Sequence, residues 1–344
     1  MSIKLPEGKI PPETLKNVVF KNLGVSNPRV LLGPGIGEDA AVIELEHKVI
    51  VVATDPITGA IEDIGWLSVH INANDIACHG AKPTWFLSTI LLPEDSDEKT
   101  LEKIVAQMDK AAKELEVTIV GGHTEVTPGL KRPIVIGFMI GEVEKGKFIT
   151  SSGALPGDKI ILTKGVAIEG TAIIATEREK ELISMIDKNL VKKAKQYKWK
   201  ISVVKDALTA VEVGGVTAMH DPTEGGVLGG LHEIADASKV GFAIQEEKIR
   251  KMISEETRKI CEILQIDPLC LIGSGALLIT AKPEKAEQIV NTLNDKGIFA
   301  EIIGHILDNP KRRIFFRKDG KTKKAQRLVQ DALWEALSKK LNNS

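Results

Sequence analysis

The sequence predicts an α/β protein of two domains, in which short apolar strands alternate with helices. The chain has 344 residues, whereas a single hydrophobic core usually organises roughly 100 to 200, so two domains are expected. The stretch 151–158, which reads SSGALPGD, interrupts the alternation with Gly, Pro and Ser. We therefore place the domain boundary there, with a first domain at residues 1–152 and a second at 153–344.

In the first domain, three short β-branched runs predict strands at 49–53, 85–91 and 133–140. The residues between these strands have helical patterns at 64–76 and 100–115. The first domain is therefore expected to alternate strand and helix.

The second domain continues this alternation. Its expected elements are a strand at 159–163, a helix from about 169, a helix near 202–211, a glycine-rich turn at 221–230, a helix from 231, a strand at 276–280 and a final helix near 325–341. The Lys-rich segment 191–200 is interpreted as a solvated helix face.

Composition disfavours several classes of protein. The formal charge is −1, from 46 basic and 47 acidic residues, so the basic excess of nucleic-acid-binding proteins is missing. No apolar run reaches the roughly 18 residues of a membrane helix, and residues 1–12 do not resemble a signal peptide. The three cysteines, Cys78, Cys261 and Cys270, have neither CxxC spacing nor clustered histidines. We expect a cytoplasmic protein without a zinc site, a nucleic-acid partner, a membrane span or a nucleophilic cysteine.

The first of four clusters with chemical potential is the glycine-rich stretch 33–42, GPGIGEDAAV, in which Gly37 permits a tight turn and Asp39 precedes an expected strand. An ordinary hairpin is the alternative interpretation. The second cluster is Thr54-Asp55, where an apolar strand ends on a carboxylate. An ordinary cap explains Asp55 equally simply.

The third cluster, at 72–83, places Asn74 and Asp75, both candidate ligands for nucleotide phosphates, within a largely apolar helix. Buried amides and carboxylates need partners, and either a metal or an internal hydrogen-bond network would provide them. The fourth cluster is Gly121-Gly122-His123-Thr-Glu125, which follows an expected strand at 117–120. Gly121 and Gly122 are candidate phosphate-binding residues because they permit close approach of the backbone, and an ordinary turn is the alternative interpretation.

Carboxylates dominate these clusters, and Mg²⁺ prefers oxygen ligands. We therefore expect Asp39, Asp55 and Asp75 to hold Mg²⁺ and nucleotide phosphates, together with Asp221 of the second domain and with Glu125 as a further acid. His123 is a poor Mg²⁺ ligand. It is instead expected to donate to phosphate or to accept a substrate proton, and His123 and Glu125 are the candidate catalytic residues.

The second domain adds two candidate anion sites at helix N-termini. One contains Lys164, which follows the expected strand 159–163. The other is 221–226, DPTEGG, where the backbone of Thr223, Gly225 and Gly226 could approach phosphate. Simple N-capping by Asp221 or Thr223 remains the alternative at this second site.

Five ordered motifs resemble the superfamily of aminoimidazole ribonucleotide synthase (PurM), HypE, selenophosphate synthetase and thiamine-monophosphate kinase. These motifs are GxGEDAAV at 35–42, TDP at 54–56, NANDIACHGAKP at 72–83, GGHTEV at 121–126 and DPTEGG at 221–226. The segments 8–12 and 261–269 are more similar to HypE than to the other members.

This resemblance implies a PurM-like fold, with a ferredoxin-like first domain that pairs with a second copy to form a β-barrel and an α/β second domain. It also implies that ATP and Mg²⁺ bind near the dimer interface, with Asp39, Asp55 and Asp75 at the phosphate and metal positions.

The chain departs from the HypE pattern at four places. HypE-like chains end in a reactive cysteine, whereas this sequence ends in Ser344, so the HypE reaction is not expected on this terminus. His123 replaces an acid, Glu224 replaces an arginine, and Ser274 stands where the family has a glutamate. Substrate recognition is therefore expected to differ.

We expect an ATP-dependent enzyme that phosphorylates an oxygen of a small, anionic metabolite. A small-molecule kinase similar to thiamine-monophosphate kinase is one alternative. A HypE-like nucleotide-binding maturation factor that acts with a protein partner and lacks turnover is another.

Overall fold

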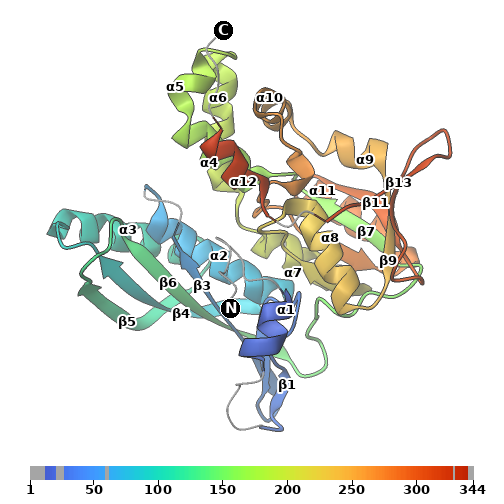
Figure 1. Cartoon of the computed structure of the whole chain (residues 1–344). Coiled ribbons are helices and arrows are strands. Elements are labelled where there is room, and N and C mark those ends of the chain that lie inside the picture. Colours follow the sequence, from blue (N-terminus) through green and yellow to red (C-terminus); the bar gives the residue numbers. More distant parts are fainter. Residues whose placement is uncertain (1–11, 21–26, 59–61, 328–329, 340–344) are drawn as a thin grey trace.

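The computed structural model describes residues 12–20, 27–58, 62–327 and 330–339. The chain forms two β-sheets, each with its own helices (Figure 1). The last strand of the first sheet, β6, ends at Glu144, and the first strand of the second sheet, β7, begins at Lys159, so the predicted boundary at 151–158 lies between the two sheets in the sequence. The predicted two-domain α/β fold is confirmed. Among the described residues, no helix is both long and apolar enough to cross a membrane.

The first sheet has six strands in the order β1-β2-β3-β6-β4-β5. Only β4 and β5 pair in parallel, and the other neighbours are antiparallel. The elements of this domain are α1 (Pro12–Thr14), η1 (Leu15–Val19), β1 (Val30–Leu32), β2 (Ala41–Glu44), β3 (Lys48–Ile57), α2 (Ile64–Cys78), β4 (Lys82–Leu92), α3 (Glu98–Glu114), β5 (Thr118–Val126) and β6 (Ile134–Glu144).

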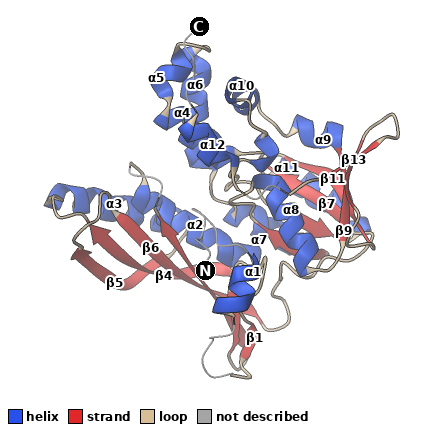
Figure 2. Cartoon of the chain, in the orientation of Figure 1, coloured by secondary structure: helices blue, strands red, loops and turns tan. Residues whose placement is uncertain are grey.

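Helices α2 and α3 cover one face of this sheet (Figure 2). Helix α3 is amphipathic, and its inward side carries Ile104, Met108 and Ala111 at helical spacing. By contrast, every residue of α2 is buried, because this helix packs against the sheet and α3 and also against α7 of the second domain. A helix enclosed in this way needs no polar stripe, and polar side chains within it require internal partners.

The opposite face of the first sheet is apolar. Successive side chains along each strand point to opposite faces of the sheet. Val135, Met139 and Phe86 are buried beneath the helices, whereas Phe138 points to the other face and is 37% exposed. Among the described residues, no helix packs on this face (Figure 1). The face therefore has the composition of a surface that another layer could cover.

The second sheet has seven strands in the order β13-β12-β9-β11-β7-β10-β8. Only β12 and β9 pair in parallel. Its strands are β7 (Lys159–Thr163), β8 (Val216–His220), β9 (Gly241–Gln245), β10 (Leu278–Ala281), β11 (Ala300–Leu307), β12 (Arg313–Phe316) and β13 (Thr322–Lys324). Its helices are α4 (Ile168–Glu177), α5 (Glu179–Ile183), α6 (Lys188–Lys195), η2 (Gln196–Lys200), α7 (Val204–Val213), α8 (Gly226–Ala237), α9 (Glu246–Lys251), α10 (Glu255–Leu264), η3 (Pro268–Cys270), α11 (Pro283–Asp295) and α12 (Ala332–Ser338).

One hydrophobic core crosses the domain boundary. It contains side chains of α2 and the first sheet together with Ile161 of β7, Met219 of β8 and Ile279 of β10. A separate core on the other side of the second sheet includes Phe242, Leu231 and residues of α4, α10 and α12. The shared core joins the two domains and fixes their side chains relative to one another.

Several boundaries differ from the sequence predictions. The strand expected at 117–120 continues to Val126, because β5 pairs with β4 along its length, so the alternative interpretation of 121–125 as a turn is wrong. The expected turn at 221–230 ends early, since α8 begins at Gly226. Asp55 lies inside β3 rather than after it.

The last helix is shorter than predicted. The final helix covers Ala332–Ser338 instead of 325–341, and Asp331 caps its N-terminus by accepting from the backbone N–H of Leu333. The HypE-like segment 8–12, apart from Pro12, and the chain end at 340–344 lie outside the described residues.

Candidate functional site

The structure brings acidic side chains of both domains together. We call the group formed by Asp39, Asp55, Asp75, Cys78 and Asp221 the interdomain acidic site. Its members come from the loop before β2, from β3, from α2 and from the residue after β8.

The centre of the site is formed by Asp39, Cys78 and Asp221. One ligand atom from each of these three residues lies within 4.8 Å of the others. Cys78 is fully buried, and its thiol donates to Oδ1 of Asp221 over 3.6 Å. Cys78 therefore lies beside two carboxylates, although the neighbouring residues in the sequence, Ile76 and Ala77, are apolar.

His220, the last residue of β8, holds Asp39 in place. Its Nδ1 lies 2.7 Å from Oδ2 of Asp39, and its Nε2 lies 2.8 Å from Oε2 of Glu233 in α8. Burial alone would lower the pKa of His220, but Asp39 and Glu233 raise this pKa well above its ordinary value. The imidazolium donates to both carboxylates and links the first domain to α8.

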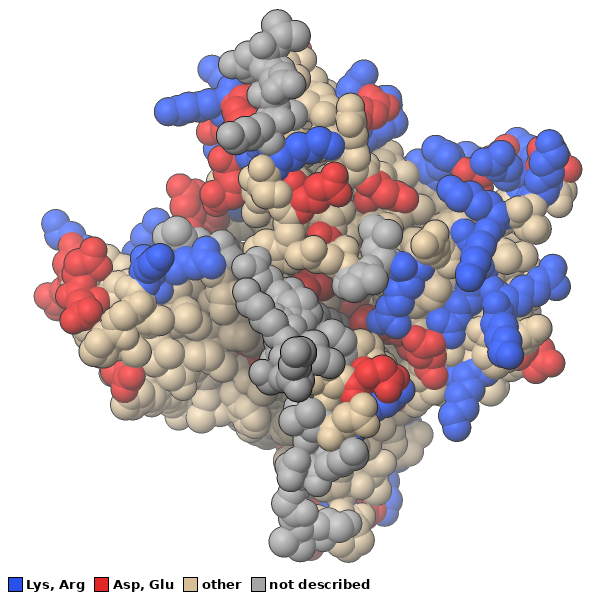
Figure 3. All heavy atoms as spheres, viewed as in Figure 1, with Lys and Arg blue, Asp and Glu red and all other residues tan. Residues whose placement is uncertain are grey.

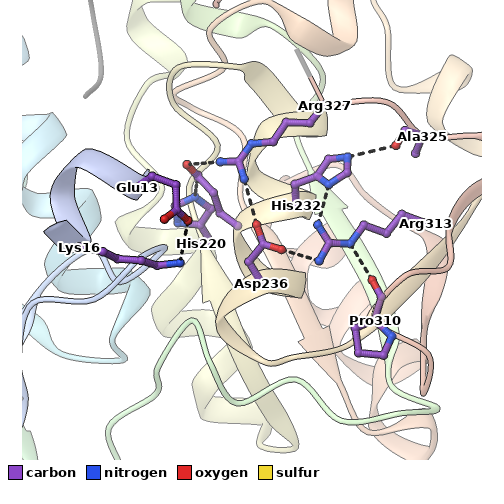
Figure 4. A network of polar contacts seen from close by, with 10 residues as sticks. Glu13, Lys16, His220, His232, Asp236, Pro310, Arg313, Ala325 and Arg327 are labelled. Atoms are coloured by element: carbon purple, nitrogen blue, oxygen red, sulfur yellow. Dashed lines mark hydrogen bonds and ion pairs between the residues drawn. The ribbon is translucent and has the colours of Figure 1, made fainter. Parts of the chain in front are cut away.

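Glu233 also contacts Arg327, which belongs to a polar network with Asp236, Arg313 and His232 (Figure 4). Arg327 lies 3.6 Å from Glu233 and 2.9 Å from Asp236, which also pairs with Arg313. Arg313 donates to Nδ1 of His232, and burial, followed by the neighbouring arginines, lowers the pKa of His232 to about 4. His220 is thus charged, whereas His232 is neutral.

Burial and mutual repulsion shape the electrostatics of the acidic site. Burial raises the pKa of Asp221 to about 7, and the charges of Asp39 and Asp55 act in the same direction. The pKa of Cys78 is raised well above its usual range by burial and then by Asp221, Asp39 and Asp75. Ionisation of these two groups is therefore unfavourable without a cation, and a bound cation would favour it.

The residues present fit a divalent cation. Asp221 is 1% exposed, and within the described part of the chain no donor reaches its Oδ2 atom. A buried carboxylate oxygen without a partner is costly. A metal ion bound by Asp39 and Asp221, with Asp55 and Asp75 nearby, would satisfy this oxygen and reduce the repulsion.

Other predicted phosphate ligands already have partners within the chain. The amide of Asn74 donates to the carbonyl of Ile201 over 3.0 Å and accepts from the N–H of Val203 over 2.8 Å. The ammonium group of Lys164 contacts the carboxylate of Asp206 and the carbonyl of Ser202. Burial lowers the pKa of Lys164, although Asp206 opposes this effect.

The glycine turn before α8 holds an internal carboxylate. The N–H of Gly225 donates to Oδ2 of Asp331 over 2.6 Å, and that of Ile272 donates to Oδ1 over 3.2 Å. The carbonyl of Thr223 accepts from the N–H of Gly226 over 3.0 Å. Gly226 has φ +62°, and an added Cβ would meet backbone oxygens of 269 and 271 at under 3 Å, so glycine is required there.

Gly37 is likewise required, because the backbone of its loop packs closely against the backbone of α8. Its φ is +80°, and a Cβ atom would lie 2.9 Å from the carbonyl oxygen of Glu233. The loop that carries Asp39 therefore rests directly on α8. This contact explains the glycine through packing between the domains.

The predicted catalytic pair lies on the exposed edge strand β5, among residues that are all exposed. His123 Nε2 lies 3.1 Å from Oε2 of Glu125, whose other oxygen accepts from Thr127. These hydrogen bonds lower the pKa of Glu125. Gly121 and Gly122 belong to the same strand, and Gly122 permits close packing against Ser88 of β4.

Sequence reasoning missed His220, Glu233, Asp331 and the chemical setting of Cys78. The partners of these side chains lie far away along the chain, as in the pair His220–Asp39, which is separated by 181 positions. The adjacency of His220 to Asp221 was the one available signal.

The second domain also carries a basic surface. Nine of the seventeen residues at 311–327 are Lys or Arg, and Asp319 is the one acid among them. Figure 3 shows these basic side chains gathered over the part of the second domain that contains β9, β12 and β13. The near-zero formal charge of the whole chain concealed this local excess.

Comparisons with known proteins match both halves of the chain. The model of the AIR synthase related protein N-terminal domain matches residues 37–143, and that of the C-terminal domain matches 156–317. A putative hydrogenase expression/formation protein of Methanocaldococcus jannaschii is 33% identical, over 87% of this chain and 88% of the relative. Carbamoyl dehydratase HypE of Rhizobium leguminosarum bv. viciae is 30% identical, over 79% and 77%.

Solved structures agree with these matches. HypE in a HypE–HypF complex has a TM-score of 0.76 and 26% identity, covering 92% of this chain and 99% of that one. HypE in complex with ATP has a TM-score of 0.71 and 24% identity, with coverage of 96% and 98%.

Proposed function

The chain belongs to the family of AIR synthase related proteins, and on that premise we propose that it is an ATP- and Mg²⁺-dependent enzyme that phosphorylates an oxygen atom of a small molecule. The observation that carries this proposal is the convergence of Asp39, Asp75 and Asp221 at the domain boundary. When bound, Mg²⁺ would offset the charge of the phosphate oxygens.

The residues of this chain contribute positioning and electrostatics. Asp39 and Asp221 supply carboxylate oxygens from the two domains, and His220 fixes the orientation of Asp39. The glycine turn before α8 offers less to a phosphate than its motif suggested, because Asp331 already accepts from Gly225. Nucleotide binding is therefore centred on the interdomain acidic site.

We further propose that the open face of the first sheet pairs with a second copy of the chain. The exposed Phe138 and the apolar composition of this face support pairing, since a patch of this kind is unfavourable in water. His123 and Glu125 on the edge strand β5 would then lie near the dimer boundary. In this arrangement they are the candidate proton-transfer residues for a substrate bound beside ATP.

Calorimetry of ATP binding with and without Mg²⁺ tests the central proposal. Asp75→Asn should abolish Mg²⁺-dependent binding, because it removes a carboxylate from the acidic site, while the fold persists. Asp109→Asn on the exposed side of α3 is the matched control and should bind ATP like the parent. Unchanged affinity of the Asp75 variant would refute the site assignment.

Product analysis separates two enzyme classes. An enzyme that activates an oxygen for displacement releases ADP and inorganic phosphate, whereas a small-molecule kinase keeps the phosphoryl group in its product. Following ADP and phosphate in the same sample against a panel of anionic metabolites assigns the class. His123→Ala should lower turnover more than it lowers ATP affinity if His123 transfers a proton.

The basic surface at 311–327 favours a third candidate, a nucleotide-binding maturation factor that acts with a protein partner. Lys323 and Lys324 lie on the exposed edge strand β13, where an acidic protein surface could bind. This candidate predicts ATP binding without steady hydrolysis. It also predicts binding to purified HypF that the double variant Lys323→Glu/Lys324→Glu weakens, with Lys285→Glu on α11 as the control.

A further inference from the structure

The proposed Mg²⁺ site assigns no role to the thiol of Cys78 at the centre of the interdomain acidic site. Cys78 ends α2, is fully buried, and lies against Asp221 with Asp39 beside it. The other cysteines, Cys261 and Cys270, lie in the separate core of the second domain. Cys78 is therefore the one cysteine of the chain that shares a site with two carboxylates of different domains.

A second observation points to a cation at this position. Oδ2 of Asp221 is buried, and no donor in the described part of the chain reaches it. The thiol contacts the other oxygen, Oδ1, and its single proton cannot satisfy both. A metal ion among the three side chains would contact the remaining oxygen and the sulfur at once.

We propose that Asp39, Cys78 and Asp221 bind a thiophilic divalent ion of the Zn²⁺ or Co²⁺ class more tightly than Mg²⁺. This inference rests on the proposed function, because it concerns the metal used at the same site. Mg²⁺ favours octahedral oxygen coordination, whereas thiolate ligands favour softer ions. A sulfur ligand therefore shifts the metal preference of a carboxylate site from Mg²⁺ toward softer ions such as Zn²⁺ and Co²⁺.

The spacing of the three side chains suits such an ion. Zn–S distances near 2.3 Å and Zn–O distances near 2.1 Å place neighbouring tetrahedral ligands roughly 3.5 Å apart. The ligand atoms here already lie within 4.8 Å of one another, so small side-chain rotations complete the site. The fourth position remains for water or a phosphate oxygen.

The surroundings orient one of the ligands. His220 donates to Asp39 and is itself held by Glu233, which restricts the carboxylate of Asp39 before any ion arrives. Partners of this kind behind a ligand strengthen metal binding in proteins. Coordination replaces the S–H bond of Cys78 with a sulfur–metal bond and releases one proton to solvent, and no electron is transferred.

Titration of the full-length protein with Co²⁺ tests the inference, because thiolate-to-cobalt charge transfer gives a near-ultraviolet absorption band. We expect a band that saturates at one Co²⁺ per chain, is lost in Cys78→Ser, and persists in the double variant Cys261→Ser/Cys270→Ser. We also expect Zn²⁺ to displace Co²⁺ and Mg²⁺ to fail at a roughly hundredfold excess. Absence of the band, or its persistence in Cys78→Ser, would overturn the proposal.

Two further measurements keep the result interpretable. X-ray absorption of the Zn²⁺-loaded parent reports directly whether sulfur is bound, so the test does not depend on the folding of a variant. A coordination shell of oxygen and nitrogen alone refutes the proposal. Calorimetry with Mg²⁺ and ATP is scored separately: sulfur coordination without ATP binding removes the proposed function and keeps this inference, and ATP binding without sulfur coordination does the reverse.

Discussion

Glu169, in the first turn of α4, should make the stability of this protein depend on pH. Part of the residue reaches the surface, but its Oε2 atom is buried, and no partner for it is found in the described part of the chain. Burial raises the pKa of Glu169 to about 7, with Asp331 and Asp221 adding to the effect and Ser274 opposing it. The folded protein therefore favours the protonated side chain.

The magnitude follows from linkage between protonation and folding. In the unfolded chain Glu169 has the ordinary glutamate pKa of about 4.5, whereas in the folded chain its pKa is about 7. Between these values the unfolded state loses its proton first, so stability falls as pH rises. The full cost above the folded pKa is about 3 kcal/mol, of which about 2 kcal/mol appears between roughly pH 5.5 and pH 8.

The perturbation is Glu169→Gln, which keeps the shape and removes the titration. Urea unfolding of the parent and the variant, followed by tryptophan fluorescence across this pH range, measures the difference in unfolding free energy. The variant should gain about 2 kcal/mol relative to the parent as the pH rises. Glu177→Gln, at an exposed position of the same helix, should show no such change. A constant difference between Glu169→Gln and the parent at all pH values would refute the reasoning.

Three further predictions concern packing and assembly. Arg178→Ala should expose α12 to proteolysis and cost about 3 kcal/mol, because the buried guanidinium donates to carbonyls of that helix and of its C-cap, whereas Arg258→Ala on the surface should cost under about 0.5 kcal/mol. Phe138→Asp should convert a dimer to a monomer in sedimentation, and Val105→Asp on α3 should not; equal masses would exclude the open sheet face as the interface. Asn74→Ala should lower the unfolding free energy by about 2 kcal/mol, since two buried backbone groups lose their partner. Full stability of this last variant, with ATP binding lost, would instead support a direct nucleotide contact.

Local sequence patterns predicted the helices and strands whose bounds depend mainly on their own residues. The strand at Lys159–Thr163 was placed correctly, because four consecutive apolar or β-branched residues, at 160–163, follow a Pro-Gly break. Helix α3 was predicted at 100–115 from its helical spacing, and the structure places it at Glu98–Glu114 with Asp97 as its N-cap. Strand β5 was cut short because its continuation through Gly121 and Gly122 depends on pairing with β4, which local sequence does not encode.

The candidate site divides in the same way. The sequence identified Asp39, Asp55 and Asp75 because carboxylates in glycine-rich or apolar contexts are unusual wherever they occur. It did not reveal the thiol of Cys78 as their neighbour, because metal-type spacing is visible only when ligands are close in sequence. The net charge of the whole chain likewise did not reveal the basic surface at 311–327, because a total charge does not say where the charged residues lie.

By itself, the sequence determined the alternation of strands and helices and the two-domain fold, and it singled out the acidic residues that we propose as cation ligands. Tertiary structure alone decided which groups meet: His220 between Asp39 and Glu233, and Cys78 against Asp221. The physical reason is that hydrophobic periodicity reports the environment of each segment, whereas distances between side chains of different domains depend on how the shared core packs the segments together.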